Sequence, residues 1–177
     1  MELNDEVFIE APRDVVYAAL NDPEILKQCI PGCEELTKSS DTELSAKVVL
    51  KVGPVKAKFA GDVTLDPSEA PSKFSLIGEG NGGVAGFAKG GADVELIEEN
   101  GGTTLRYIAK AEIGGKLAQL GGRLVASTAN KLSKNFFEKF DEVVTAQHAA
   151  ALGLSPDAAP DESESEEKKS LWNRVFG

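Results

Sequence analysis

Histidine and cysteine are scarce in this chain of 177 residues, which contains one histidine, His148, and two cysteines, Cys29 and Cys33. A zinc or iron site of the common kind needs several such ligands, so most metal chemistry is excluded. The scarcity of histidine also gives no support to a Ser-His-acid or Cys-His catalytic arrangement. We interpret the segment Cys29-Ile30-Pro31-Gly32-Cys33 as two partly buried thiols around a turn rather than as a metal or redox pair.

Long hydrophobic runs are absent as well. No stretch approaches the roughly 20 apolar residues that a membrane-spanning helix needs. The first ten residues mix acids with apolar side chains, whereas a secretory signal opens with positive charge. We therefore expect a cytoplasmic protein whose cysteines are reduced.

Positive charge is also scarce: the chain has 19 basic and 29 acidic residues, and its net charge is −10. Such a chain repels phosphate backbones, so no nucleic-acid partner is expected. The apolar fraction of 41% and the charged fraction of 27% are ordinary for a soluble globular protein.

Strict alternation of apolar and polar residues predicts strands at residues 43–51, 55–65 and 104–113. Weaker alternation indicates further strands at residues 2–10, 33–38, 72–79 and 91–98. Turn residues separate them at Gly53-Pro54, at Asp66-Pro67 and at Asn100-Gly101-Gly102. We expect the glycine-rich residues 78–83 to form a hairpin loop. About seven strands in hairpin succession predict an antiparallel sheet.

Helical periodicity appears in three places. Two short helices are predicted at residues 12–20 and 23–29, after the first strand. A stripe of period 3.6 from Leu117 to Val144 predicts a long helix that contains Gly121 and Gly122 and reaches about Ala151. One helix cannot cover both faces of seven strands. We therefore predict an α+β fold in which a curved antiparallel sheet wraps around the long C-terminal helix.

Inward-facing positions of the predicted sheet carry many small residues, and small residues leave volume between sheet and helix. Such a volume is either filled by helix side chains or open as an apolar pocket. The only ionisable candidates inside are Asp5 and Tyr107, so no catalytic residue is predicted. The predicted pocket liners are Phe59, Phe74, Phe87, Tyr107, Leu120 and Leu124.

Composition divides the chain into three parts: a folded domain at residues 1–152, an acidic linker at 153–169 and a short tip at 170–177. The linker sequence SPDAAPDESESEE is too polar to bury a core, so we expect it to be disordered. The tip is amphipathic as a helix and follows two lysines, which is typical of an interfacial membrane anchor. Docking into a groove of a partner protein is the alternative. The predicted contact residues are Lys168, Lys169, Leu171, Trp172, Arg174, Val175 and Phe176.

Four strings in order resemble the carbon monoxide dehydrogenase G-subunit family of the START-like, or SRPBCC, superfamily. They are FIEAPRDVVYAALNDPEILKQCIPGCEEL, GPVKAKFAGDVTL, GGVAGFAKGGADVEL and GGKLAQLGGRLV. The resemblance covers about residues 1–144 and implies the helix-grip fold. It also implies a non-catalytic accessory protein of a molybdenum hydroxylase of the carbon monoxide dehydrogenase type.

Two further expectations combine this resemblance with the residues. Proteins of the family are linked to bringing the enzyme to the membrane, where electrons pass to quinone, and the fold commonly holds an apolar ligand. We hypothesise a bound isoprenoid quinone and no other cofactor, in a cytoplasmic protein peripherally associated with the inner face of the cell membrane. A ligand-free scaffold for tethering or assembly is the alternative. An enzyme of the same fold, such as a cyclase or hydratase, is the third hypothesis.

Overall fold

Successive hairpins build the sheet, and the computed structural model describes residues 1–153 of the chain. The elements in chain order are β1 (Glu2–Ile9), α1 (Arg13–Leu20), α2 (Pro23–Cys29), β2 (Cys33–Lys38), β3 (Glu43–Val52), β4 (Val55–Asp66), β5 (Lys73–Asn81), the 3-10 helix η1 (Gly83–Ala85), β6 (Phe87–Glu99), β7 (Gly102–Gly114), the 3-10 helix η2 (Gly115–Leu120) and α3 (Gly122–Ala151). The predicted linker from residue 154 and the tip lie outside the described residues.

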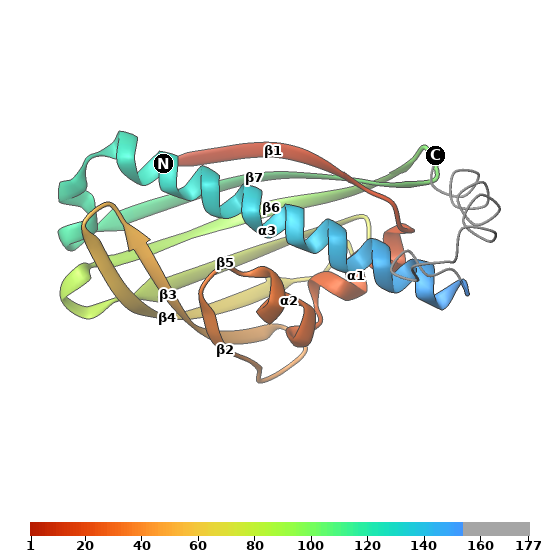
Figure 1. The fold of residues 1–177 in the computed structure, drawn as a ribbon, viewed down its shortest axis with the longest axis horizontal. Helices are drawn as coiled ribbons and strands as arrows, with labels where there is room; N and C mark the ends of the chain where they lie inside the picture. Colours follow the sequence, from red (N-terminus) through yellow and green to blue (C-terminus); the bar gives the residue numbers. More distant parts are fainter. Residues whose placement is uncertain (154–177) are drawn as a thin grey trace, which may run out of the picture.

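All seven strands form one antiparallel sheet in the order β1-β7-β6-β5-β4-β3-β2. The long helix α3 lies along one face of this sheet (Figure 1). Its backbone contacts β1 and β3 more than it contacts the central strands between them. The predicted α+β fold, with a curved sheet around a long C-terminal helix and two short helices after the first strand, is confirmed.

The turns follow from the residues predicted to make them. Asn100 and Gly101 both have positive φ, at 53° and 76°, and they form the two-residue loop of the β6–β7 hairpin. This backbone shape suits the right-handed twist of the strands that it joins, which explains the Asn-Gly pair. Gly53, with φ of 57°, makes the corresponding turn between β3 and β4.

Glycines in the middle of the sheet allow the strands to approach closely. A Cβ atom on Gly90 would lie 2.0 Å from the carbonyl oxygen of Lys110, and one on Gly91 would lie 2.8 Å from that of Leu76. The prediction that residues 78–83 form a loop was wrong, because β5 continues through Gly78 and Gly80 to Asn81. Glycine has no side chain to reveal alternation, so the sequence pattern concealed the end of this strand.

Local signals also determine where the helices begin. Pro23 is the first residue of α2, and the Asp22 carboxylate accepts a hydrogen bond of 2.9 Å from the backbone N–H of Glu24. The prediction that the long helix already includes Leu117 and Gly121 was wrong, whereas Gly122 does belong to it. Gly121 has φ of 94°, which ends η2, and α3 begins at Gly122.

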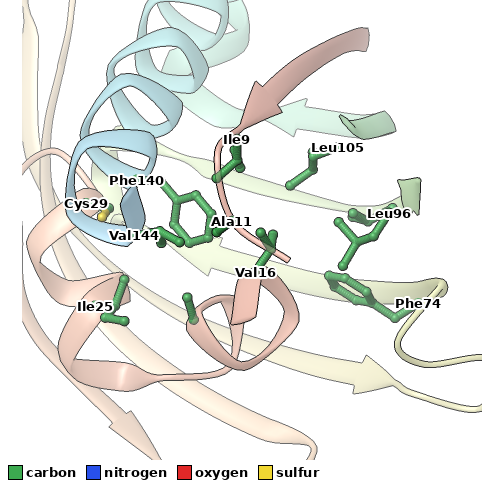
Figure 2. Close-up of a cluster of buried hydrophobic side chains, with 12 residues drawn as sticks. Ile9, Ala11, Val16, Ile25, Cys29, Phe74, Leu96, Leu105, Phe140 and Val144 are labelled. Atoms are coloured by element: carbon green, nitrogen blue, oxygen red, sulfur yellow. The ribbon is translucent and has the colours of Figure 1, made fainter. Parts of the chain in front are cut away.

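Two separate apolar clusters hold the sheet and helices together. The large core joins α1, α2 and the C-terminal half of α3 to the sheet (Figure 2). The small core lies where the β3–β4 hairpin, η1 and η2 meet. The buried residues of the large core are Ile9, Ala11, Val16, Ala19, Ile25, Cys29, Phe74, Val94, Leu96, Leu105, Phe140 and Val144, and those of the small core are Val52, Phe59, Ala85 and Leu117.

Candidate ligand-binding site

Between the two cores, the face of the sheet that is turned toward α3 carries small side chains. Cross-strand pairing aligns these residues in rows that run across β4, β5, β6 and β7. A row of this kind presents little more than backbone and methyl groups. We call these residues the concave band: Gly61, Gly78, Gly80, Ala88, Gly90, Ala92, Ala109 and Ala111.

The N-terminal half of α3 carries several small residues on the side that faces the sheet, beside the larger, half-buried Val125 and Leu132. Counting back at helical spacing from the fully buried Phe140 gives Ser133, Ala129 and Ala126 on the inward stripe. The C-terminal half of the same stripe carries phenylalanines and Val144. One helix face therefore changes from small to large side chains halfway along its length.

Side chains on both walls remain partly accessible to solvent. Ala126, Ala129 and Ser133 on the helix are half-buried, and so are the larger Val63 and Leu76 on the same face of the sheet. Residues that face each other across a filled core would be buried. The partial exposure of both walls favours a ligand-binding space between the concave band and the N-terminal half of α3, which we take as the candidate site.

Aromatic side chains close the end of this space next to the large core. The ring centroids of Tyr107 and Phe137 are 5.3 Å apart in a stacked arrangement. Phe136 lies 5.0 Å from Phe137 and 5.7 Å from Phe140, again between centroids. A flat ligand ring that reached this end of the space would meet aromatic faces.

The small core closes the opposite end. A Cβ atom on Gly82 would lie 2.5 Å from the Phe59 ring, and one on Gly53 would lie 2.7 Å from the Leu124 side chain. Leu120 and Leu124 are half-buried against this cluster. This end therefore depends on fewer buried residues than the large core does.

The predicted liners thus separate into groups. Phe74 and Tyr107 lie at the large core, and Phe59, Leu120 and Leu124 lie at the small core. Phe87 does not join either group. It pairs with Gly114, alternates with the inward Ala88, and leaves 43% of its surface exposed on the outer face of the sheet.

The helix residues Ala126, Ala129 and Ser133 are not among the liners that the sequence predicts. Large apolar residues dominate the 3.6-residue stripe of this helix, and they draw attention away from the small residues between them. The signal was nevertheless in the sequence, since these three positions continue the Phe140 stripe toward the N-terminus at intervals of three and four residues.

Ionisable groups are few near the space. Asp5 pairs in register with Tyr107 but is exposed, and its carboxylate accepts a hydrogen bond of 2.8 Å from the backbone N–H of Glu6. Burial raises the pKa of Asp141 on α3, and a hydrogen bond from Thr145 partly offsets the increase. Burial and the nearby charge of Asp141 also raise the pKa of Glu10.

Both cysteines have free thiols. Cys29 is buried in the large core, Cys33 is half-buried, and burial raises the pKa of each thiol. A raised pKa lowers the fraction of nucleophilic thiolate at neutral pH. Among residues 1–153, no three His, Cys, Asp or Glu side chains form a group that could hold a metal ion.

The opposite face of the sheet has a polar hollow of about 440 Å³. Its side chains include acids, bases and two serines, which suit water better than an apolar ligand. No helix in the described part of the chain combines the length and the apolar character needed to cross a bilayer. The polar side chains that line this hollow are those of Asp66, Ser68, Glu69, Lys73, Ser75, Asp93, Glu95 and Arg106.

Solved structures share this architecture. A conserved protein from Geobacillus kaustophilus is 28% identical, with a TM-score of 0.77, over 84% of this chain and 97% of that one. An aromatase/cyclase from a Streptomyces species is 11% identical, with a TM-score of 0.65, over 85% and 97% of the two chains. A STAR-related lipid transfer protein from Xanthomonas axonopodis is 19% identical, with a TM-score of 0.55, over 78% and 85%.

The last two similarities are too distant in sequence to show more than the fold, which is START-like. No curated protein sequence matches the chain. The family model of the carbon monoxide dehydrogenase G subunit (CoxG) matches residues 6–145, which include all strands except the first four residues of β1, and most of α3. Since this match spans most of the sequence, the chain belongs to the CoxG family.

Proposed function

We propose that the chain is a non-catalytic accessory protein that carries an isoprenoid quinone for a molybdenum hydroxylase of the carbon monoxide dehydrogenase type. Family membership and the START-like fold support an accessory protein that binds a ligand. The observation that carries the proposal is the two facing walls of small, half-buried residues, the concave band and the N-terminal half of α3. The tip at residues 170–177 then associates the protein with the inner face of the cell membrane.

The chemistry of the walls supports a quinone in particular. An isoprenoid tail is a chain of apolar carbon, and the methyl groups of Ala92, Ala109 and Ala129 offer it a matching surface. The quinone ring has two flat faces, which suit the stacked pair of Tyr107 and Phe137. Hydroxyl groups of Tyr107 and Ser133 can donate to its carbonyl oxygens.

Native mass spectrometry of the full-length protein, purified without detergent from its own host, tests the proposal. The expected result is a discrete added mass that extracts into organic solvent as a quinone. An unliganded mass that does not change after incubation with quinone-loaded vesicles would contradict it. That result would favour the alternative, a ligand-free scaffold that tethers or assembles the enzyme.

A second test fills the proposed site with an added side chain and compares the result with a control on the same helix. Ala129→Phe places an aromatic ring on the inward stripe of α3 and should abolish the added mass while the protein stays folded. Ala150→Phe adds the same ring at an exposed position of the same helix and should leave the added mass unchanged. Equal ligand loading of the two variants would show that the ligand lies elsewhere.

A further inference from the structure

Charge is distributed unevenly in this acidic protein. Residues 44–61, 80–92 and 113–137 together contain nine of the 19 basic residues and none of the 29 acidic ones. The rest of the chain is correspondingly more acidic than its average. A separation of this size along a sequence matters only if folding brings the three segments together.

Folding does bring them together. The β3–β4 hairpin, η1, η2 and the start of α3 lie at the same end of the molecule, on the left in Figure 1. Contacts confirm this arrangement, because η1 packs on η2 and Leu124 of α3 packs on Gly53 of the hairpin. The opposite end carries α1 and α2.

Four basic side chains at this end have no acidic partner. Lys47 and Lys58 of the hairpin are paired with Glu35 and Glu34 of β2, at 3.4 Å and 2.8 Å. In contrast, the members of what we call the basic end are exposed and form no ion pair within residues 1–153. They are Lys51, Lys56, Lys116 and Arg123.

An apolar residue projects from the same end. Val84 of η1 is 93% exposed, more than any other large apolar residue in the described part of the chain. An exposed apolar side chain among unpaired basic residues is typical of a protein that binds the interface of a bilayer containing anionic lipids. An acidic protein partner could bind through the basic residues alone, so it would not explain the exposure of Val84.

We propose that the basic end docks on an anionic lipid surface, with Val84 inserted at the level of the headgroups. The acidic remainder of the protein is repelled by the same surface, so that charge selects this orientation. Docking places the small core, which has fewer buried residues than the large core, against the lipid. The proposal adds a second membrane contact to that of the tip, and it rests on the proposed function only for the identity of the cargo.

Charge reversal in the full-length protein tests the docking. Binding to vesicles of phosphatidylcholine and phosphatidylglycerol should weaken at least about tenfold in a Lys116→Glu/Arg123→Glu variant, since each basic residue near such a surface contributes about 1 kcal/mol. Lys27→Glu/Lys73→Glu makes the same change in net charge at exposed positions on α2 and at the large-core end of β5, and should retain at least half of the affinity. Equal weakening in both variants, or in neither, would overturn the proposal.

Moving the single tryptophan from the tip to position 84 allows fluorescence to report directly whether η1 enters the bilayer. The natural Trp172 lies in the tip, so Trp172→Phe/Val84→Trp leaves a single tryptophan, on η1. Its emission should shift to the blue on anionic vesicles and stay unchanged on neutral ones. Trp172→Phe/Ile77→Trp, at a residue 66% exposed on the outer face of the sheet, should show no shift. An unshifted Val84→Trp signal on vesicles that bind the protein would assign all contact to the tip.

Loss of the tip separates this proposal from the proposed function. If a Trp172→Ala/Phe176→Ala variant retains measurable binding that depends on Lys116 and Arg123, the basic end is a membrane contact in its own right. If that variant loses all binding, the second contact is overturned and the tip remains. Quinone loading is measured independently of both results.

Discussion

Two carboxyl groups at the surface of the large core show how burial acts on single residues. Asp141 and Glu10 both have a raised pKa, Asp141 through burial, and Glu10 through burial and then the charge of Asp141. Between the unfolded pKa near 4 and these raised values, the folded protein holds more protons than the unfolded chain. The protonated forms of Asp141 and Glu10 therefore add stability to the folded protein below about pH 4, the unfolded pKa. This stability is lost as the pH rises through the folded pKa values.

Replacing Asp141 by asparagine tests this pH dependence. Asp141→Asn removes the buried charge, and its side-chain oxygen still accepts from Thr145. The melting temperature should rise by a few degrees at pH 7.5 and by less at pH 4.5, the small size reflecting solvent screening. Asp41→Asn, at an exposed turn, should behave the same at both pH values. A larger gain at the acidic pH would contradict the assignment.

Gly90 is constrained by the neighbouring strand. Because its Cβ position lies 2.0 Å from the Lys110 carbonyl oxygen, Gly90→Ala should destabilise the protein by about 1–3 kcal/mol in a urea unfolding experiment. Gly122 meets no atom within 4 Å, so Gly122→Ala serves as the control. That change should be neutral or stabilising, since alanine is the better helix former. Equal effects would show that the sheet adjusts freely.

At the level of elements, α3 combines two functions in one stripe. Its C-terminal half contributes Phe140 and Val144 to the large core and fixes the helix to α1 and α2 (Figure 2). Its N-terminal half contributes small, half-buried residues that face the concave band. The helix is thus anchored at one end and forms a wall of the candidate site at the other.

Truncation of two phenylalanines on α3 should separate these functions. Phe140→Ala removes a fully buried ring and should cost about 3–5 kcal/mol of unfolding free energy. Phe137→Ala removes a half-buried ring at the edge of the space, so it should cost less and should weaken ligand loading through the loss of stacking on Tyr107. Circular dichroism and native mass spectrometry measure the two effects. A greater cost at Phe137 would mean that the space is filled.

The whole molecule has a polarity that no single element shows. The large core lies toward the end that carries α1 and α2, whereas the small core and the basic end lie at the other. Ligand that binds only the folded protein must raise its stability by mass action. Added quinone should therefore raise the melting temperature of the wild type and have no effect on Ala129→Phe. A rise of the same size in both would indicate nonspecific binding.

Much of the fold could be predicted because its signals are local. Alternation in residues 55–65, the Asn100-Gly101 turn and the 3.6-residue stripe ending at Val144 each act over neighbouring residues, and the structure confirms them. The errors in the fold fell on glycines. Gly78 and Gly80 lie in a strand, and Gly121 ends a 3-10 helix, because a residue without a side chain gives no pattern to follow.

The sequence by itself determined the fold class, the order of elements and the family, since these depend on periodicity, turn chemistry and motifs along the chain. Only the tertiary structure decided which small residues face one another across the space, and which of the predicted liners belong to its two ends. It also decided that three acid-free segments far apart in sequence meet at one end of the molecule. The physical reason is that register, facing and charge clustering are relations between segments, which pairing and packing establish.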